Sequence, residues 1–499
     1  MPKPLVVIDD FSAGLIDDPT IPARSGGQTY DCIDVITTPG SARAELAAEH
    51  TGAEIANLDD FINSFTIYDG DGTDRILGIT HSTKKVFVRN NSGVFEVGNT
   101  NTALTGTALT AGGADIIKFA GKCYCSATEE NLVQIDGDAL LTASFDDTFK
   151  TFTNSDTRHI MREFAGLLCI TDGRNIATLD PDHTTFNGTA LTLPLGYKAM
   201  CIEPFGDFLA IGTKAVVSSA NDNVGLEGFA KVFLWDGVST DASRIIDVGI
   251  ETGVTAMLTV NNQLYVFTQK KTQPIGVNIH RFNGSAFDIV RTIRSQESGL
   301  SSGMGIFANA VMPFNGDILM GTRSISGTAL KNGVYALTRP DSNSPFALVL
   351  KAKPESADSV AKLNGTIAGA LTTFQSNLYV SWNVNDGAGF DEDSVDHIDA
   401  SSSPYNGAVW ESQIYENAAF QRVLAKGVRL VLPPIPAGSV DIAYKLDNAA
   451  AWTSLGTITS TNQDDIYYGI YSRFKTIQIQ LTFNTSGANT PEVRRIEIY

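Results

Sequence analysis

The sequence has few basic residues for its length. Its 36 Lys and Arg are outnumbered by 55 Asp and Glu, which gives a formal net charge of −19. A protein that holds DNA or RNA by neutralising phosphates needs a basic surface, so this balance argues against nucleic-acid binding and against attraction to anionic membranes. The acidity suits solubility, and it equally suits a surface past which a polyanion slides without binding.

Long apolar runs are absent as well. No stretch approaches the roughly 18 apolar residues of a membrane-spanning helix. The run Leu5–Ile8 near the start is too short to be the hydrophobic region of a signal peptide. We therefore expect no membrane span and no secretory signal.

Cysteine is scarce and irregularly spaced. The five cysteines are Cys32, Cys123, Cys125, Cys169 and Cys201. Cys123 and Cys125 are two residues apart, but there is no matching second pair, and structural zinc usually requires two. The last four lie in or beside apolar runs, where a free cysteine behaves as a small hydrophobe. We expect reduced, buried thiols made in a cytoplasm.

What the sequence does contain is typical of β structure. Hydrophobic residues make up 43% of the chain, which is enough apolar surface to offset the entropy lost on ordering. Glycine is frequent, with 45 residues, and so are the other turn-forming residues. This composition favours many short strands joined by tight turns.

A pattern of paired strands recurs between about residues 65 and 415 at a spacing of about 40 to 60 residues. In most copies a turn that follows a Phe leads into an aliphatic strand, and a partner strand comes after a polar gap. The aliphatic strands are Arg75–Thr80, Gly121–Ser126, Gly166–Thr171, Gly206–Thr213, Asn262–Thr268, Gly316–Thr322 and Asn377–Trp382. The partner strands are Gly93–Val97, Leu132–Gly137, Ile176–Pro181, Val232–Gly237, Ile279–Gly284, Val334–Thr338 and the weaker Asp396–Asp399.

Each copy is too small to bury its own faces, whereas radially arranged copies cover one another. The repeats therefore predict an all-β fold with a β-propeller of about seven four-stranded blades, six or eight being the alternatives. Stacked β-sandwiches are the competing architecture. The pattern changes near residue 416, where the strand Val423–Leu432 begins a different arrangement that includes the alternating strand Arg473–Phe483. We predict three parts: an extended arm over residues 1–62, the propeller over 63–415 and a small sandwich over 416–499.

The search for chemistry finds little. Gly299–Gly303 has the spacing of a nucleophile elbow but lacks the α/β surroundings which that motif needs. Asp69, Asp71 and Asp74 resemble a calcium loop, but no terminal Glu follows and Asp-Gly pairs are usual in hairpins, so we favour a hairpin over a weak calcium site. The six histidines are scattered and indicate structural or surface positions rather than metal ligands.

Glycosidases need two carboxylates at a set separation. Many acidic residues lie in turns here, and the sequence alone neither selects such a pair nor excludes one. No phosphate-binding or dinucleotide-binding motif is present. We predict that the chain is not an enzyme, that it has no catalytic or cofactor-binding residues, and that it uses no cofactor.

The two ends of the chain carry the most specific features of the sequence. The N-terminal features are Asp10–Leu15, Asp18-Pro19, Asp31–Val35, and Pro39-Gly40 with Arg43 and Glu45. They resemble the start of tailed-phage virion proteins, in which an arm of the form Phe-Ser-Gly-Gly-Leu is followed by a strand and a turn, with departures at Ala13 and Asp34. The C-terminal features are Leu446-Asp447 with Trp452, Leu455 and Gly456, and then Thr490–Ile496, which are similar to a sandwich of phage tail proteins. Together the two ends cover about a quarter of the chain.

The best-fitting family is the tail nozzle, or tail hub, protein of short-tailed phages. The resemblance implies a propeller-bearing subunit that forms a ring, usually six-fold, with copies of itself. Its partners would be adaptor or portal-proximal tail proteins and tail fibres or spikes, and DNA would pass through without specific binding. Phe11, Gly14 and Leu15 of the arm are candidates for assembly contacts. The expected location is the virion tail, after synthesis in the cytoplasm of the bacterial host.

Two other classes remain open. A receptor- or glycan-binding propeller module of a tail tip or cell surface is one, and a polysaccharide-degrading enzyme is the other. Tyr405, Trp410 and Tyr415 would favour either class if they lay exposed in a cleft. Packing between the last blade and the sandwich is the alternative interpretation for these aromatic residues.

Overall fold

The computed structural model covers the 499-residue chain. It describes all residues except 1–3, 9–28, 34, 39–40, 45–48, 51–59, 70–72, 82–85, 90–94, 98–114, 127–130, 137–143, 154–158, 216–228, 250–252, 270–275, 295–303, 325–331, 339–345, 355, 357–364, 386–387, 390, 399–403, 405, 413, 417–421, 436, 448, 450, 460–464 and 488. Within this described part the regular structure is entirely β, which confirms the predicted fold class. No helix long and apolar enough to cross a membrane occurs among these residues.

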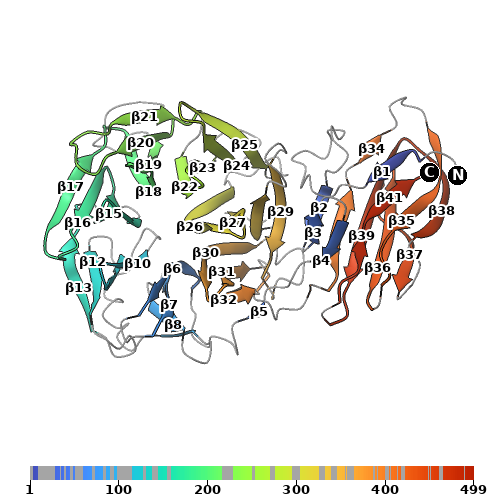
Figure 1. Cartoon of the computed structure of the whole chain (residues 1–499), viewed down its shortest axis with the longest axis horizontal. Helices are drawn as coiled ribbons and strands as arrows, with labels where there is room; N and C mark the ends of the chain where they lie inside the picture. The colour runs from blue at the N-terminus through green and yellow to red at the C-terminus, as the bar shows by residue number, and fades with distance from the viewer. Residues whose placement is uncertain are drawn as a thin grey trace.

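Seven four-stranded units arranged in a ring form the larger body (Figure 1). Blade 1 comprises β6 (Ile62–Tyr68), β7 (Arg75–Thr80), β8 (Val86–Arg89) and β9 (Phe95–Val97). Blade 2 comprises β10 (Ile116–Phe119), β11 (Lys122–Ser126), β12 (Asn131–Asp136) and β13 (Ser144–Thr151). Blade 3 comprises β14 (Met161–Phe164), β15 (Leu167–Asp172), β16 (Asn175–Leu179) and β17 (Phe186–Thr192). Blade 4 comprises β18 (Tyr197–Phe205), β19 (Phe208–Ala215), β20 (Lys231–Trp235) and β21 (Arg244–Asp247).

The remaining three blades follow in sequence order. Blade 5 comprises β22 (Gly253–Val260), β23 (Gln263–Gln269), β24 (Gly276–Phe282) and β25 (Phe287–Arg294). Blade 6 comprises β26 (Met304–Phe314), β27 (Asp317–Ser324), β28 (Val334–Thr338) and β29 (Ala347–Ala352). Blade 7 comprises β30 (Thr366–Phe374), β31 (Asn377–Asn385), β32 (Asp391–Ile398) and β5 (Glu49–His50).

The first strands of neighbouring blades contact one another all the way around, from β6 through β30 and back to β6. The described residues therefore form a closed seven-bladed β-propeller. The last blade takes its fourth strand, β5, from the N-terminal region, where Glu49 and His50 pair with His397 and Asp396. Because β5 precedes β6 in the sequence, the chain contributes a strand to blade 7 before it forms blade 1. This exchange joins the first and last blades of the ring.

The recurring turn between the first and second strands explains why the repeat was visible in the sequence. Ala120 and Gly121 have φ of 45° and 81°, and Asn261 and Asn262 have φ of 50° and 59°. Two successive residues with positive φ form the tight hairpin turn that matches the twist of antiparallel strands, and Gly and Asn tolerate that conformation best. Backbone geometry thus favours the Gly and Asn residues of the motif, although Ala120 and Ser376 also adopt positive φ in these turns.

One partner strand was assigned wrongly in blade 1. We predicted Gly93–Val97 as the partner of Arg75–Thr80, but β7 pairs with β8, with Leu77 opposite Val88. The strand β9 (Phe95–Val97) is the outer neighbour of β8. Both segments are short and apolar, so composition alone did not distinguish the third strand from the fourth.

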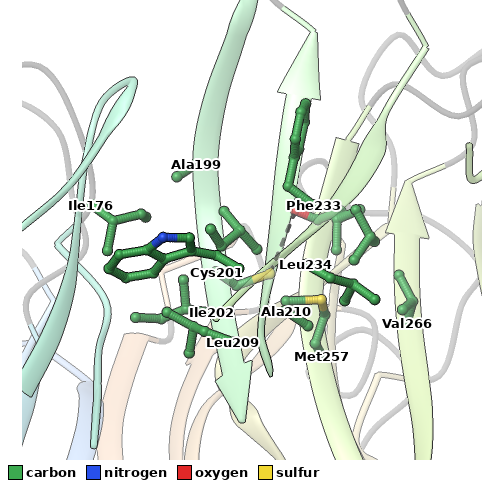
Figure 2. Packing of buried hydrophobic residues seen from close by; sticks show 14 of the residues in the cluster. Ile176, Ala199, Cys201, Ile202, Leu209, Ala210, Phe233, Leu234, Met257 and Val266 are labelled. Carbon is green, nitrogen blue, oxygen red and sulfur yellow. Dashed lines mark hydrogen bonds between the residues drawn. The ribbon is translucent and has the colours of Figure 1, made fainter. Parts of the chain in front are cut away.

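Adjacent blades share one apolar layer (Figure 2). Ile176 of blade 3, Cys201 of blade 4 and Met257 of blade 5 belong to a single buried cluster. Gly212 lies at its tightest point, because a Cβ there would come within 2.5 Å of Val254 Cγ1 and 2.8 Å of Cys201 Sγ. Side chains from neighbouring blades are therefore fully interdigitated, and each blade is stabilised by burial against the next.

The C-terminal body is a β-sandwich. One sheet has the order β1 (Val6–Ile8), β41 (Arg495–Ile498), β35 (Val423–Val431) and β38 (Asp465–Phe474). The opposing strands run in the order β37 (Thr453–Thr459), β36 (Ser439–Leu446), β39 (Thr476–Asn484), β33 (Ala408–Ser412) and β2 (Thr29–Ile33), with β34 (Tyr415–Glu416) also on β39. A small third sheet joins β3 (Val35–Thr38), β4 (Ser41–Ala44) and β40 (Glu492–Val493).

The structure moves the predicted domain boundaries. The sandwich begins before residue 416, because β33 pairs with β39 and Trp410 lies fully buried in the sandwich core. The region 1–62 is more than an extended arm, since β1 and β2 are sandwich strands and β5 is a propeller strand. The predicted strand Arg473–Phe483 is two strands, β38 and β39, which meet at Lys475. These contributions come from partners hundreds of residues away, which local patterning does not reveal.

Candidate functional site

Polar side chains from six blades meet at the propeller axis. They come from the inner strands β6, β14, β18, β22 and β26 and from the residue just before β10. We call this group the axial polar network, and its members are Ser64, Asp115, Arg162, Glu203, Thr259 and Asn309. Ser64 and Asp115 are buried and the other four members are only partly exposed. Buried polar groups need hydrogen-bond partners within the protein, and the network supplies them.

Asp115 is the anionic centre of the network. Its carboxylate accepts hydrogen bonds from Ser64 Oγ, from the backbone N–H of Met161 at 2.8 Å and from Asn309 Nδ2 at 3.0 Å. Arg162 Nη1 lies 3.5 Å from its Oδ2. Asp115 is 1% exposed, so these partners replace the solvation that the charge would have in water.

Arg162 and Asn309 connect opposite sides of the ring. Arg162 Nη2 donates to Asn309 Oδ1 at 3.0 Å. Arg162 belongs to blade 3 and Asn309 to blade 6, and two blades separate them in one direction and three in the other. A hydrogen bond between side chains of such distant blades crosses the propeller's central channel, so the channel is closed at this level.

A local irregularity in β26 allows Asn309 to reach the axis. The register of β26 against β27 shifts between Ile306 and Val311, and the residues between them leave the ladder. Bulges of this kind redirect a side chain without ending the strand. The inner strands β6, β18, β22 and β30 also carry register shifts against their partners.

Glu203 is the second carboxylate of the network. Its Oε1 accepts the backbone N–H of Thr259 at 2.8 Å, and its Oε2 lies 3.9 Å from Arg162 Nε. Burial raises the pKa of Glu203, and the Arg162 guanidinium and the hydrogen bonds from Thr259 offset only part of that rise. The guanidinium of Arg162 thus lies between Asp115 and Glu203, which come from blades 2 and 4.

This arrangement has two chemical capacities. As a structural element it cross-links blades through charge-assisted hydrogen bonds. As a reactive group, a largely buried carboxyl with a raised pKa releases its proton at a higher pH than an exposed carboxyl does. Four donors engage the oxygens of Asp115, whereas Glu203 accepts the backbone N–H of Thr259 and lies 3.9 Å from Arg162 Nε.

Replacing Glu203 by Gln is expected to stabilise the protein more at about pH 7 than at about pH 4. The raised pKa means that the folded state holds the proton more tightly than the unfolded state, so the wild-type chain loses stability as pH rises through the folded-state pKa. Gln cannot ionise and does not undergo this loss. Urea unfolding of both proteins at several pH values measures the difference, and a pH-independent difference would contradict the assignment.

The predicted site residues fall in different places. Asp69 forms an ion pair with Lys118, and Asp74 is exposed, while Asp71 lies outside the described residues. The segment joins β6 to β7 with Tyr68 opposite Arg75, which confirms the hairpin interpretation. No group of three His, Cys, Asp or Glu side chains placed to hold a metal occurs in the part of the chain that the structure describes. Phe11, Gly14, Leu15 and the Gly299–Gly303 segment lie outside the described residues.

The cysteines and histidines are structural where they are described. Cys123, Cys125, Cys169 and Cys201 are free and buried, as predicted, and burial raises the pKa of the Cys125 and Cys169 thiols to about 12. The described histidine rings pack against aromatic rings, and the five are His81, His159, His183, His280 and His397.

Two of the three aromatic residues that could have lined a cleft are described, and neither is exposed in one. Trp410 is fully buried and Tyr415 packs against the core of the sandwich itself. Tyr405 lies outside the described residues.

The axial polar network was missed by the sequence analysis. Its members lie on different strands and share no local motif. A weak signal exists in hindsight, since Arg162 and Glu203 each stand two residues before the Phe of the recurring turn. At that position the other copies carry uncharged residues, for example Ile117 and Met312.

No protein-family model matches the sequence, and no curated protein matches it. Solved structures do show likeness. A glycoside hydrolase family 43 arabinoxylan arabinofuranohydrolase from Bacillus subtilis is 12% identical, with 91% of this chain and 99% of that chain covered and a TM-score of 0.32. An exo-β-1,3-galactanase from Phanerochaete chrysosporium is 9% identical, with 68% and 95% covered and a TM-score of 0.30. An extracellular domain assigned to a hybrid two-component system of B. thetaiotaomicron is 10% identical, with 96% and 64% covered and a TM-score of 0.42.

These neighbours correct one prediction. We predicted from the lack of a catalytic motif that the chain is not an enzyme, and the presence of glycoside hydrolases among the similar structures contradicts that exclusion. A missing motif is weak ground for excluding catalysis, because catalytic groups are assembled from distant strands, as the axial polar network is. At such low identity the chain is similar to these proteins in fold alone, and the likeness assigns it no reaction.

Proposed function

We propose that the chain is a structural protein of a phage tail that forms a ring-shaped nozzle or hub. DNA would be ejected through the ring, and fibres or spikes would attach to it. The observation that carries the proposal is that the two ends of the chain, which separately resemble tail proteins, fold into one body. The strand β4 pairs with β40, and this places Arg43 opposite Glu492.

The same body contains further strands from both ends of the chain. The strand β1 pairs with β41, with Val6 opposite Ile498. The strand β2, which includes part of the Asp31–Val35 feature, pairs with β33, with Cys32 opposite Trp410. Residues more than 370 positions apart thus form single sheets, which supports the proposal that the N-terminal and C-terminal features belong to one architectural unit.

The closed propeller channel bears on the route of DNA. The link between Arg162 and Asn309 crosses the channel, so a duplex would not pass through one subunit. The route in our proposal is the axis of the ring that several subunits enclose. The net charge of −19 supports this role, because an acidic wall repels phosphate and a repelled polymer slides.

Measurement of mass in solution tests the proposal. We expect particles of six times the 53.3 kDa of one chain, and ring-shaped images by electron microscopy, at high protein concentration or on isolated tails. A closed ring requires head-to-tail contacts between different surfaces. The double variant Phe11→Ser, Leu15→Ser is expected to abolish the ring. The control is Leu195→Ser, at a residue that is 51% exposed on the propeller, and it is expected to retain the ring.

Two outcomes would argue against the ring. One is a chain that stays monomeric both in solution and on tails. The other is a ring whose axial surface is basic, since such a surface would bind DNA and not release it.

A second function is supported by a separate observation. A receptor- or glycan-binding module of a tail tip or cell surface needs an exposed recognition surface, and the sandwich presents two exposed tyrosines, Tyr467 and Tyr471, on one sheet face. Binding of a polysaccharide by the monomeric chain tests this function independently of ring formation.

A further inference from the structure

We propose that the outer face of the β1–β41–β35–β38 sheet binds an acidic polysaccharide. The inner face of this sheet packs on the sandwich core through residues such as Val428, Leu430 and Ile496. Because side chains alternate along a strand, Tyr467, Tyr471 and Arg473 of β38 lie on the opposite face. Tyr467 is 48% exposed and Tyr471 is 71% exposed. Figure 1 shows the sheet at the end of the sandwich that lies away from the propeller.

The two tyrosine rings lie along the sheet rather than standing away from it. Gly427 and Gly469 are direct partners across β35 and β38. A Cβ on Gly427 would come within 2.5 Å of the Tyr467 ring and hydroxyl, and a Cβ on Gly469 would overlap the Tyr471 ring. Each ring therefore covers a glycine, which leaves one broad face of the ring turned toward solvent. Flat, exposed aromatic faces are suited to stacking against the apolar C–H faces of sugar rings.

Tyr471 is held in this position at an energetic cost. Its φ is 52°, in the left-handed region that disfavours side chains with a Cβ. It lies where the pairing of β35 with β38 shifts between Ala425 and Gly427. Backbone strain of this kind concentrates at binding sites.

The charge of this face identifies the class of ligand. Strands β35, β38 and β41 carry Lys426, Arg429, Arg473 and Arg495 against Asp465 and Glu497. The face is thus net positive on a chain whose overall charge is −19. Charge complementarity therefore favours an anionic ligand at this face, in contrast to the acidic chain as a whole.

The cations on the face are not all equivalent. Arg429 pairs with Asp465 and with Glu497, the latter at 3.2 Å, and Arg495 Nη2 lies 3.0 Å from Glu497. Among the described residues Lys426 and Arg473 have no such carboxylate partner, so they are available to an acidic group of a ligand. Arg473 stands two residues from Tyr471, which places a charge beside a stacking ring.

Other occupants fit less well. Single-stranded DNA has one charge per nucleotide, and the acidic remainder of the chain would repel so dense a polyanion. A polysaccharide with one carboxylate among several neutral sugars has a lower charge density and more apolar ring faces. A protein partner usually requires a compact apolar centre, whereas the two rings here are bordered by Lys and Arg side chains.

Binding measured by calorimetry or affinity electrophoresis tests the proposal, with polygalacturonate as the acidic probe, dextran as the neutral probe and oligothymidylate as the nucleic-acid probe. We expect binding to polygalacturonate that weakens with added salt. Tyr471→Gly and Arg473→Gln are each expected to weaken it by about tenfold, the effect of losing one stacking or charged contact. Tyr471→Gly also relieves the positive φ, so loss of binding would not reflect unfolding.

Phe229→Ala is the matched control, because Phe229 is an aromatic residue that is 49% exposed on the propeller. Equal binding of dextran would overturn the acidic ligand, and binding of oligothymidylate alone would overturn the polysaccharide. Self-association that Tyr471→Gly abolishes would identify a second copy of the chain as the occupant. Polygalacturonate binding that Tyr471→Gly and Arg473→Gln leave unchanged would overturn the site.

Discussion

Replacing Asp115 by Ala is expected to lower the free energy of unfolding by about 3–5 kcal/mol, the usual effect of removing one partner from a buried ion pair. The substitution leaves Arg162 without its buried counter-ion. It also removes the acceptor for Asn309 and for the backbone N–H of Met161, which belong to blades 6 and 3. A buried donor that loses its acceptor contributes a further desolvation penalty.

Urea unfolding followed by tryptophan fluorescence measures this effect. Asp207→Ala provides the control, because Asp207 is an exposed residue in the turn between β18 and β19 of blade 4 and its loss should change stability by less than about 0.5 kcal/mol. Asp115→Asn is expected to resemble Asp115→Ala, since an amide nitrogen would face donors instead of acceptors. Equal stability of Asp115→Ala and Asp207→Ala would mean that the network does not lock the blades.

The propeller was predictable because its repeat is local. In blades 2 to 7 the first two strands are joined by a turn that contains positive-φ residues, as at Ala120-Gly121 and Asn261-Asn262, and an apolar strand follows it. Backbone geometry limits which residues occupy such turns, so the sequence pattern survives even where the strands themselves vary. Seven aliphatic strands, most of them preceded by such a turn, were enough to predict about seven blades.

The strand exchanges were not predictable because their causes are distant in the sequence. β5 has only two residues, and its place in blade 7 depends on a partner strand that begins at Asp391. β1 likewise has three residues and pairs with the last strand of the chain. Segments this short have no periodicity to interpret, and only tertiary contacts determine where they pair.

The axial polar network and the exposed tyrosines were missed for a related reason. The closed ring brings together Asp115, Arg162 and Asn309, and nothing in the sequence around any one of them predicts these contacts. The exposure of Tyr471 was missed for a different reason, because the sequence analysis predicted a single strand across the turn at Lys475. Its exposure depends on the bulge in β38, which the alternating pattern does not show.

A chain that lacks residues 1–51 is expected to show the largest loss of stability. The truncation removes β1 from the edge of the sandwich sheet, β2 from its place between β33 and β29, and β5 from blade 7. It also removes β3 and β4 from the small sheet that they form with β40. Each backbone hydrogen bond lost contributes about 1 kcal/mol, so the removal of these five strands exceeds the effect of any single substitution described above. The edges that become exposed on β32, β33 and β41 would also promote aggregation.

Thermal unfolding and limited proteolysis of the soluble fraction measure the effect. A chain that lacks only residues 1–4 is the matched control, because the hydrogen bond from Leu5 N–H to the Ile498 carbonyl and the pairing of β1 remain possible. We expect the control to unfold like the full chain and the longer truncation to be cleaved rapidly in both bodies. Selective cleavage of the sandwich alone would instead mean that β5 is dispensable for closing the ring, and that contacts between β6 and β30 hold blade 1 to blade 7 without it.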